Sequence, residues 1–165
     1  MTQLARPLFI VVLVVGAILI SATTDHLPAQ IASHFGAGGV PNGSMNRGFY
    51  LLFMLAFAVL LPVVLVLSIG VLPRRMPAAV GIPNRVYWLD PARREATLRY
   101  LAAHACWLGS LMVVFIVAIH FLLILANATQ PPRLPFQPFI AVLALFLIAT
   151  GFWTATLMLH FRNRK

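Results

Sequence analysis

The sequence predicts an all-α integral membrane protein: a four-helix bundle that forms a single domain over residues 1–165. Hydrophobic residues make up 61% of the chain and charged residues only 9%, whereas a soluble domain carries roughly 25% charged residues. A helix needs about 20 apolar residues to cross a bilayer, because each residue adds about 1.5 Å. Apolar runs of about this length cover residues 8–23, 49–72, 102–126 and 139–160.

The basic residues indicate how these helices are oriented. If both termini are cytoplasmic, ten of the 12 basic residues lie on the cytoplasmic side. These ten are Arg6, Arg74, Arg75, Arg85, Arg93, Arg94, Arg99, Arg162, Arg164 and Lys165. Only Arg47 and Arg133 lie outside, and such an excess in short cytoplasmic loops is the usual signal of orientation. We therefore expect a multi-pass plasma-membrane protein with cytoplasmic N and C termini.

The formal charge of +9 does not predict a nucleic-acid partner. The basic residues lie between hydrophobic runs, so we expect them to contact the anionic headgroups of the lipid bilayer. The sequence has no G-x-S-x-G, phosphate loop or HExxH, and its one cysteine, Cys106, lies in an apolar run. Because these are the signatures of common enzyme and metal sites, we expect a non-enzymatic protein without a cofactor or metal.

The first two helices show recognisable start and stop signals. Arg6 and the apolar run after it resemble a signal peptide, but no small-x-small cleavage site follows residues 20–22, so we expect a retained helix. Ser44 or Asn46 is suited to cap the second helix. Pro62 lies near the middle of this helix and predicts a kink; we favour a packing kink over a gating hinge.

The interval 25–47 predicts an ordered extracytoplasmic loop between the first and second helices. Residues 30–35 can form a short extended segment. Gly36, Gly38 and Gly39, followed by Pro41-Asn42-Gly43, predict a tight turn because glycine and asparagine tolerate positive φ. This loop is the longest polar interval on the outer side.

The cytoplasmic loop predicts an extension of the third helix beyond the membrane. Asp90 followed by Pro91 has the pattern of a helix cap and first helical position, so the helix is expected to run from Pro91 to Ala126. Arg93, Arg94 and Arg99 would then form a basic edge at the headgroups, or alternatively a specific anion site. The proline-rich segment 127–137 predicts a short, stiff connection to the last helix.

The spans contain few polar residues, and none of the four has an Asp, Glu, Lys or Arg well inside it. This disfavours an ion-coupled transporter, which usually needs buried charges. His120 is the one histidine well inside a span. Two interpretations remain: a metal or proton site shared with Asp25, His26 and His34, or, as we favour, an imidazole hydrogen-bonded between helices. Thr150 and Thr154 are one turn apart and predict interhelical hydrogen bonds.

Two motifs resemble a known family. The pattern L-P-x-x-I-x-x-H-F, then G-x-P-N-G and a basic residue, is similar to the bacterial membrane family known as domain of unknown function 1648. Its residues here are Leu27, Pro28, Ile31, His34, Phe35, Gly39, Pro41, Asn42, Gly43 and Arg47. Ala32 and Asn42 stand where the family pattern has Pro and Asp. A cytoplasmic-loop motif resembles a subgroup of the family through Asn84, Tyr87, Trp88, Leu89, Pro91, Arg93 and Arg94.

The resemblance implies a function class but no reaction. The family occurs in the N-terminal part of the immunity protein against a sporulation-delaying toxin, which implies an immunity or signalling role with a protein or peptide partner at the outer loop. A second interpretation of this loop is a compact turn that only caps the bundle.

A small transporter or permeation subunit that uses His120, Thr150 and Thr154 is also compatible with the sequence, as is an accessory subunit of a larger membrane complex. A homo-oligomer also fits. Tyr87 and Trp88 are expected to anchor at the headgroups rather than bind a ligand.

Overall fold

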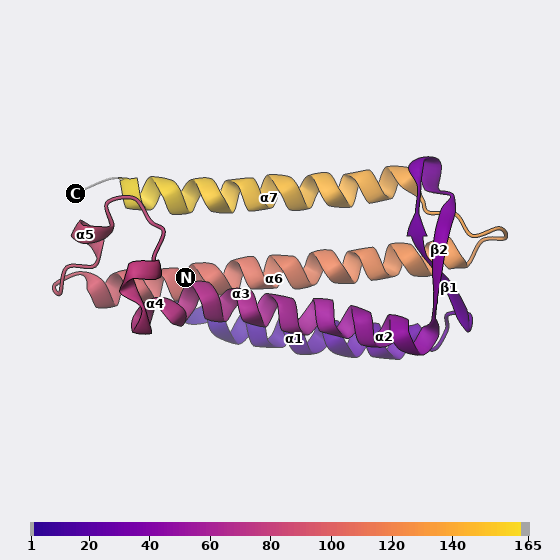
Figure 1. Cartoon of the computed structure of the whole chain (residues 1–165), viewed down its shortest axis with the longest axis horizontal. Coiled ribbons are helices and arrows are strands. Elements are labelled where there is room, and N and C mark those ends of the chain that lie inside the picture. Colours follow the sequence, from indigo (N-terminus) through magenta and orange to yellow (C-terminus); the bar gives the residue numbers. More distant parts are fainter. Residues whose placement is uncertain (1, 163–165) are drawn as a thin grey trace.

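The computed structural model describes residues 2–162 and contains four helical segments that are long and apolar enough to cross a membrane. They lie side by side along the long axis of the molecule (Figure 1). The four spans expected from the sequence are thereby confirmed. Arg164 and Lys165, which entered the charge balance, lie outside the described residues. The spanning segments are α1 (Thr2–Thr24), the stretch Arg47–Arg75, α6 (Arg94–Asn127) and α7 (Phe136–Arg162).

The second span consists of α2 (Arg47–Leu55), a π-helical turn η2 (Ala56–Leu60), α3 (Leu61–Gly70) and α4 (Leu72–Arg75). The side chain of Asn46 accepts a hydrogen bond from the Phe49 amide at 2.8 Å, which confirms the expected cap. Pro62 is the second residue after the π turn. A proline within a helix has no N–H and its ring collides with the carbonyl four residues earlier, and the wider π turn is where the backbone adapts to it.

A β-hairpin separates α1 from α2, so the all-α prediction is incomplete. β1 (Gln30–Phe35), the expected extended segment, pairs antiparallel with β2 (Pro41–Asn46) through a short turn, η1 (Ala37–Gly39). The predicted place of the turn is wrong in part. Gly38 and Gly39 have φ of 78° and 77°, and the Gly36 amide donates to the Val40 carbonyl at 2.8 Å. Because these glycines already reverse the chain, Pro41-Asn42-Gly43 belongs to β2.

Helix α6 is the centre of the bundle and packs against α1, α3 and α7. Glycine allows close approach of the helices: a Cβ on Gly109 would lie 2.7 Å from the Phe9 ring and 2.8 Å from Val66. The main contacts of α7 are with α6, and in Figure 1 it stands apart from α1 and α3. Its outward side is correspondingly exposed, for example at Phe152, of which 71% is accessible.

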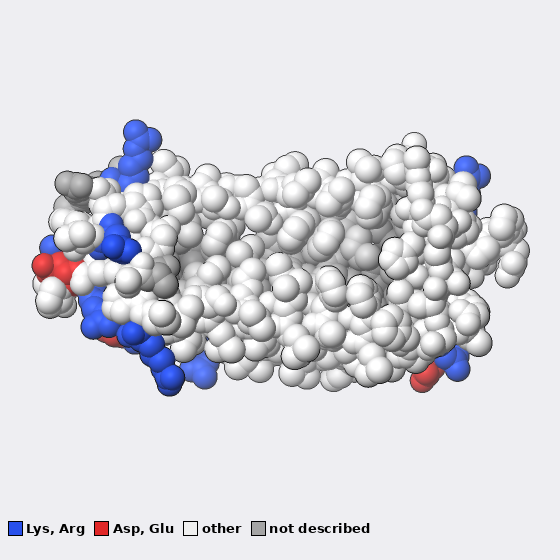
Figure 2. Space-filling model, viewed as in Figure 1, with Lys and Arg blue, Asp and Glu red and all other residues white. Residues whose placement is uncertain are grey.

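The two ends of the bundle differ in charge. We call the end that carries the hairpin the hairpin end and the opposite one the basic end. Arginine side chains gather at the basic end in Figure 2, and uncharged surface covers the middle. The basic end contains α4, η3 (Pro77–Ala79) and α5 (Arg85–Trp88).

Helix α6 begins three residues later than the sequence predicts. The Asp90 side chain accepts from the Ala92 amide at 3.1 Å, and the Asp90 carbonyl accepts from the amides of Arg93 and Arg94 at 2.9 Å. These bonds fold Pro91 and the two residues after it into a separate turn. The regular helix starts only at Arg94.

Candidate functional site

The hydrophobic residues of the first motif hold the hairpin on the bundle. Leu27 and Ile31 are buried, and no part of Ile31 is accessible. They belong to one core cluster with Ile20, Tyr50 and other residues of α1, α2 and α6. Phe35 is half-buried and packs against this cluster. These positions therefore contribute to stability rather than to a surface for a partner.

Arg47 fastens the base of the hairpin. Its guanidinium donates to the carbonyls of Asp25 and Leu27 at 2.9 and 3.1 Å. Its backbone amide donates to the Ala29 carbonyl at 3.0 Å. The end of α1, the start of β1 and the start of α2 are thus joined by one residue. This explains the basic position of the motif without a ligand.

Asn127, at the end of α6, closes the outer edge of β1. Its side-chain oxygen accepts from the Ala32 amide at 2.8 Å, and its side-chain nitrogen donates to the Ala32 carbonyl at 3.0 Å and the Leu123 carbonyl at 2.9 Å. Sequence reasoning missed this residue, which was considered only as the start of the connection 127–137. An amide side chain at a helix terminus was the one signal that could have indicated a backbone partner.

Two motif glycines are required by close packing. The Leu134 amide donates to the Gly39 carbonyl at 3.0 Å, so the connection before α7 rests on the tip of the hairpin. A Cβ on Gly39 would lie 2.5 Å from the Leu134 carbonyl oxygen. A Cβ on Gly43 would lie 3.2 Å from the Cβ of His34 across the sheet.

The polar residues of the motif remain accessible. Pro28, His34 and Asn42 are exposed, whereas Pro41 is half-buried opposite Phe35. The His34 ring nitrogen Nδ1 lies 3.1 Å from the Ser33 hydroxyl. Of the ten predicted outer-loop residues, Pro28, His34 and Asn42 are therefore the ones whose exposed side chains do not fix the hairpin on the bundle.

The second candidate, His120, lies in a buried polar cluster between helices. It is completely inaccessible; its Nδ1 is 2.8 Å from the Tyr50 hydroxyl and its Nε2 is 2.7 Å from the Thr23 hydroxyl. Because Thr23 donates its own hydrogen to the Leu19 carbonyl at 2.6 Å, it accepts from Nε2, and Tyr50 donates to Nδ1. A neutral imidazole therefore satisfies every group, and the favoured interpretation of His120 is confirmed.

The prediction for Thr150 and Thr154 is wrong. Thr154 donates to the Thr150 carbonyl of its own helix at 2.9 Å. The Thr150 hydroxyl is buried and has no hydrogen-bond partner among residues 2–162, and nothing lies within 4 Å of a Cβ built on Gly151. Thr150 lies on the partly buried side of α7 without a bonding partner for its hydroxyl, and Thr154 is exposed, so neither makes a bond to another helix among the described residues.

The second motif fastens the loop before α6 to the end of α7. The Trp88 indole donates to the Phe161 carbonyl at 2.8 Å, and the Asn84 side chain donates to the Phe161 and Arg162 carbonyls at 3.1 and 3.2 Å. The last carbonyls of a helix lack partners within it, so these donors cap α7. The Trp88 side chain thus joins the loop before α6 to the end of α7, and its indole N–H is hydrogen-bonded within the protein.

The remaining residues of this motif complete the same loop. Arg93 donates to the Tyr87 carbonyl at 2.9 Å, and its guanidinium lies 4.0 Å from the centre of the Tyr87 ring. Arg94 donates to the Arg74 carbonyl at 3.1 Å. Leu89 packs against the buried cluster around Phe161, while Pro91 is exposed in the turn before α6.

The comparisons with known proteins agree with the first motif. Residues 9–60 match the family model described as a domain of unknown function (DUF1648). This segment contains most of α1, the whole hairpin, α2 and η2. No curated protein and no solved structure matches the chain. The match to the DUF1648 model therefore covers about a third of the chain, the part that carries the first motif.

Proposed function

We propose that this chain is a non-enzymatic, multi-pass protein of a bacterial plasma membrane that binds a protein or peptide partner through the open edge of its hairpin. In this proposal both termini are cytoplasmic and the hairpin is outside. The gathering of arginines at the opposite end supports this orientation, since short basic loops stay on the cytoplasmic side. An immunity or signalling role, as in the toxin-immunity protein that the motif resembles, is the biological context we infer.

The observation that carries the proposal is the difference between the two edges of the sheet. Ala32 lies opposite Ser44, and the backbone groups of Ala32 that point away from β2 are bonded by Asn127. In such a pair of an antiparallel ladder the opposing residue also points its N–H and C=O outward. Ser44 therefore presents a donor and an acceptor at the edge of β2, where the two-stranded sheet ends.

An unpaired strand edge is the surface to which an extended peptide adds as a further strand. Main-chain hydrogen bonds then supply affinity, and side chains around the edge supply specificity. Asn42 and Ser44 are exposed along β2, and His34 is exposed on β1. Since Asn127, Arg47 and Gly39 fix the hairpin on the bundle, such an edge is pre-organised and loses little freedom on binding.

A transporter function receives less support. Both ring nitrogens of His120 are occupied by hydrogen bonds with Thr23 and Tyr50, and Thr150 and Thr154 bond to no other helix among the described residues. We therefore place the function at the hairpin rather than along a polar path through the spans.

The test is a photo-crosslinking residue placed at Asn42 of the full-length chain in its native membrane. We expect a specific crosslinked protein or peptide that disappears with Ser44→Pro, because proline removes the edge N–H, and that weakens with His34→Ala. Ser44→Ala is the matched control, since it keeps the backbone donor. A crosslink unchanged by Ser44→Pro in a protein of normal thermal stability would refute the edge-binding proposal.

A further inference from the structure

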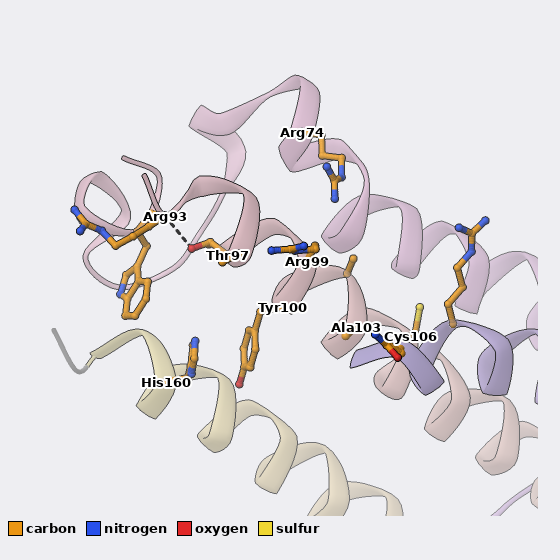
Figure 3. Close-up of a pocket in the computed structure, with 13 residues that line it drawn as sticks. Arg74, Arg93, Thr97, Arg99, Tyr100, Ala103, Cys106 and His160 are labelled. Atoms are coloured by element: carbon orange, nitrogen blue, oxygen red, sulfur yellow. Dashed lines mark hydrogen bonds between the residues drawn. The ribbon is translucent and has the colours of Figure 1, made fainter. Parts of the chain in front are cut away.

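A groove at the basic end, remote from the hairpin, combines positive charge with an apolar floor. It has a volume of about 690 Å³ and is bounded by α1, α4, the start of α6 and the end of α7. Among residues 2–162, four arginines line it, namely Arg6, Arg74, Arg93 and Arg99, and no carboxylate does. Figure 3 shows Arg74 and Arg99 approaching from different elements.

The charges of two of these arginines are not compensated. Arg74 lies 3.3 Å from Glu95, and Arg93 lies 3.7 Å from Asp90. Arg6 and Arg99 form no ion pair or hydrogen bond with any residue that the structure describes. A guanidinium that lines a groove and has no carboxylate partner is suited to bind phosphate oxygens.

The rest of the groove is apolar and aromatic. Ala96, Ala103 and Cys106 lie on one face of α6, and their small side chains keep the floor open. Tyr100 and His160 form a wall, with their rings stacked and their centres 3.8 Å apart. The floor continues from the arginines toward the apolar part of the bundle, as Cys106 packs in the cluster with Phe9 and Val113.

We propose that this groove binds an anionic phospholipid, with Arg6 and Arg99 contacting the phosphate and an acyl chain lying against Ala103 and Cys106. Charge complementarity selects the phosphate, and the apolar floor next to it selects an amphiphile over a small anion. The position at the end of the spans places the arginines where lipid headgroups lie. The groove is separate from the hairpin, so this inference does not depend on the proposed peptide partner.

The experiment measures lipid binding to the purified full-length chain by native mass spectrometry, with phosphatidylglycerol, phosphatidylcholine and inorganic phosphate as probes. We expect phosphatidylglycerol to bind about tenfold or more tightly than phosphatidylcholine, and inorganic phosphate not to displace it. The double variant Arg6→Gln/Arg99→Gln should lose about thirtyfold in affinity for phosphatidylglycerol, since each of the two basic residues near a headgroup contributes about 1 kcal/mol.

The matched control is Arg75→Gln/Arg162→Gln, which removes the same charge at the same end from exposed residues outside the groove. It should leave the affinity within about twofold of the unmodified protein. An equal loss in both double variants would show a diffuse surface charge and overturn the site. Displacement by inorganic phosphate, or equal binding of phosphatidylcholine, would overturn the phospholipid assignment. Arg6 and Arg99 are exposed, so folding is expected to persist; thermal stability and each single variant check this.

Discussion

The hairpin end and the basic end are stabilised by the same kind of bond, a side chain that satisfies backbone groups, but they leave different groups free. Asn127 and Arg47 bond the backbone of the hairpin, and the edge of β2 stays open. Trp88 and Asn84 bond the last carbonyls of α7, and Arg6 and Arg99 at the groove have no ion pair with any described residue. The first end therefore offers backbone to a partner, and the second offers positive charge.

The largest expected effect is a difference in labelling between the two ends, because we propose that they lie on opposite sides of the membrane. In a Cys106→Ala background, Asn42→Cys should react almost completely with a membrane-impermeant maleimide in intact cells, while Arg75→Cys should react only after lysis. The reason is the positive-inside orientation. Labelling measured by mass shift on a gel checks this, and reaction of Arg75→Cys in intact cells would reverse the orientation that we propose.

Next in size is the effect of Gly39→Ala on the free energy of unfolding in detergent. A side chain costs about 1–2 kcal/mol at positive φ, and here its Cβ would also collide with the Leu134 carbonyl. We expect a loss of about 3 kcal/mol, since the hydrogen bond to Leu134 is lost as well.

Gly38→Ala is the control for this substitution. Gly38 has nearly the same φ, 78°, but nothing lies within 4 Å of its Cβ. We expect Gly38→Ala to lower the free energy of unfolding by about 1.5 kcal/mol, from backbone strain alone. Equal losses for the two variants would show that the contact between the hairpin and the connection before α7 contributes nothing to stability.

Asn127→Ala should lower the free energy of unfolding by about 2 kcal/mol, less than Gly39→Ala, because the buried backbone groups of Ala32 lose their partner. Amide hydrogen exchange should accelerate at Ala32 more than in α6. Asn42→Ala, at an exposed residue of the same type, should change stability by less than about 0.5 kcal/mol. Unchanged exchange at Ala32 would mean that its edge is protected in another way.

The smallest effect is expected at the basic end. Trp88→Phe removes the hydrogen bond to the Phe161 carbonyl but keeps an aromatic ring, so the loss should be about 1 kcal/mol. Trp107→Phe is the control, since Trp107 is 40% exposed on the apolar surface of α6. Thermal unfolding of both variants measures the difference. A loss larger than that of Asn127→Ala would show that the loop before α6 is the more strongly fastened of the two.

The sequence predicted the features that depend on local chemistry. Continuous apolar runs located the spans, and Asn46 was identified as a cap because the bond to Phe49 joins residues three apart. The turn was misplaced because glycine pairs and Pro41-Asn42-Gly43 carry similar local signals, and only the pairing of the strands decides between them. The start of α6 was misplaced because the Asp90 carbonyl and side chain together favour a separate turn.

The contacts that define the candidate site are mostly non-local. Asn127 and Ala32 are 95 residues apart in the chain, and Tyr50 and His120 are 70 apart. Neither pairing follows from periodicity, which gives the face of a helix but not its neighbour. The same limit explains Thr150 and Thr154, whose spacing predicts a shared face but cannot show whether a neighbouring helix offers them a hydrogen-bond partner.

The hydrogen-bonded cluster around His120 has a mechanical consequence. It joins α1, α2 and α6 at one depth of the bundle. Sliding α1 along its axis by one residue would move Thr23 by about 1.5 Å and turn it by about 100°, which would strand an imidazole N–H in an apolar interior at a cost of about 1–3 kcal/mol. Piston or screw motions of α1 are therefore opposed.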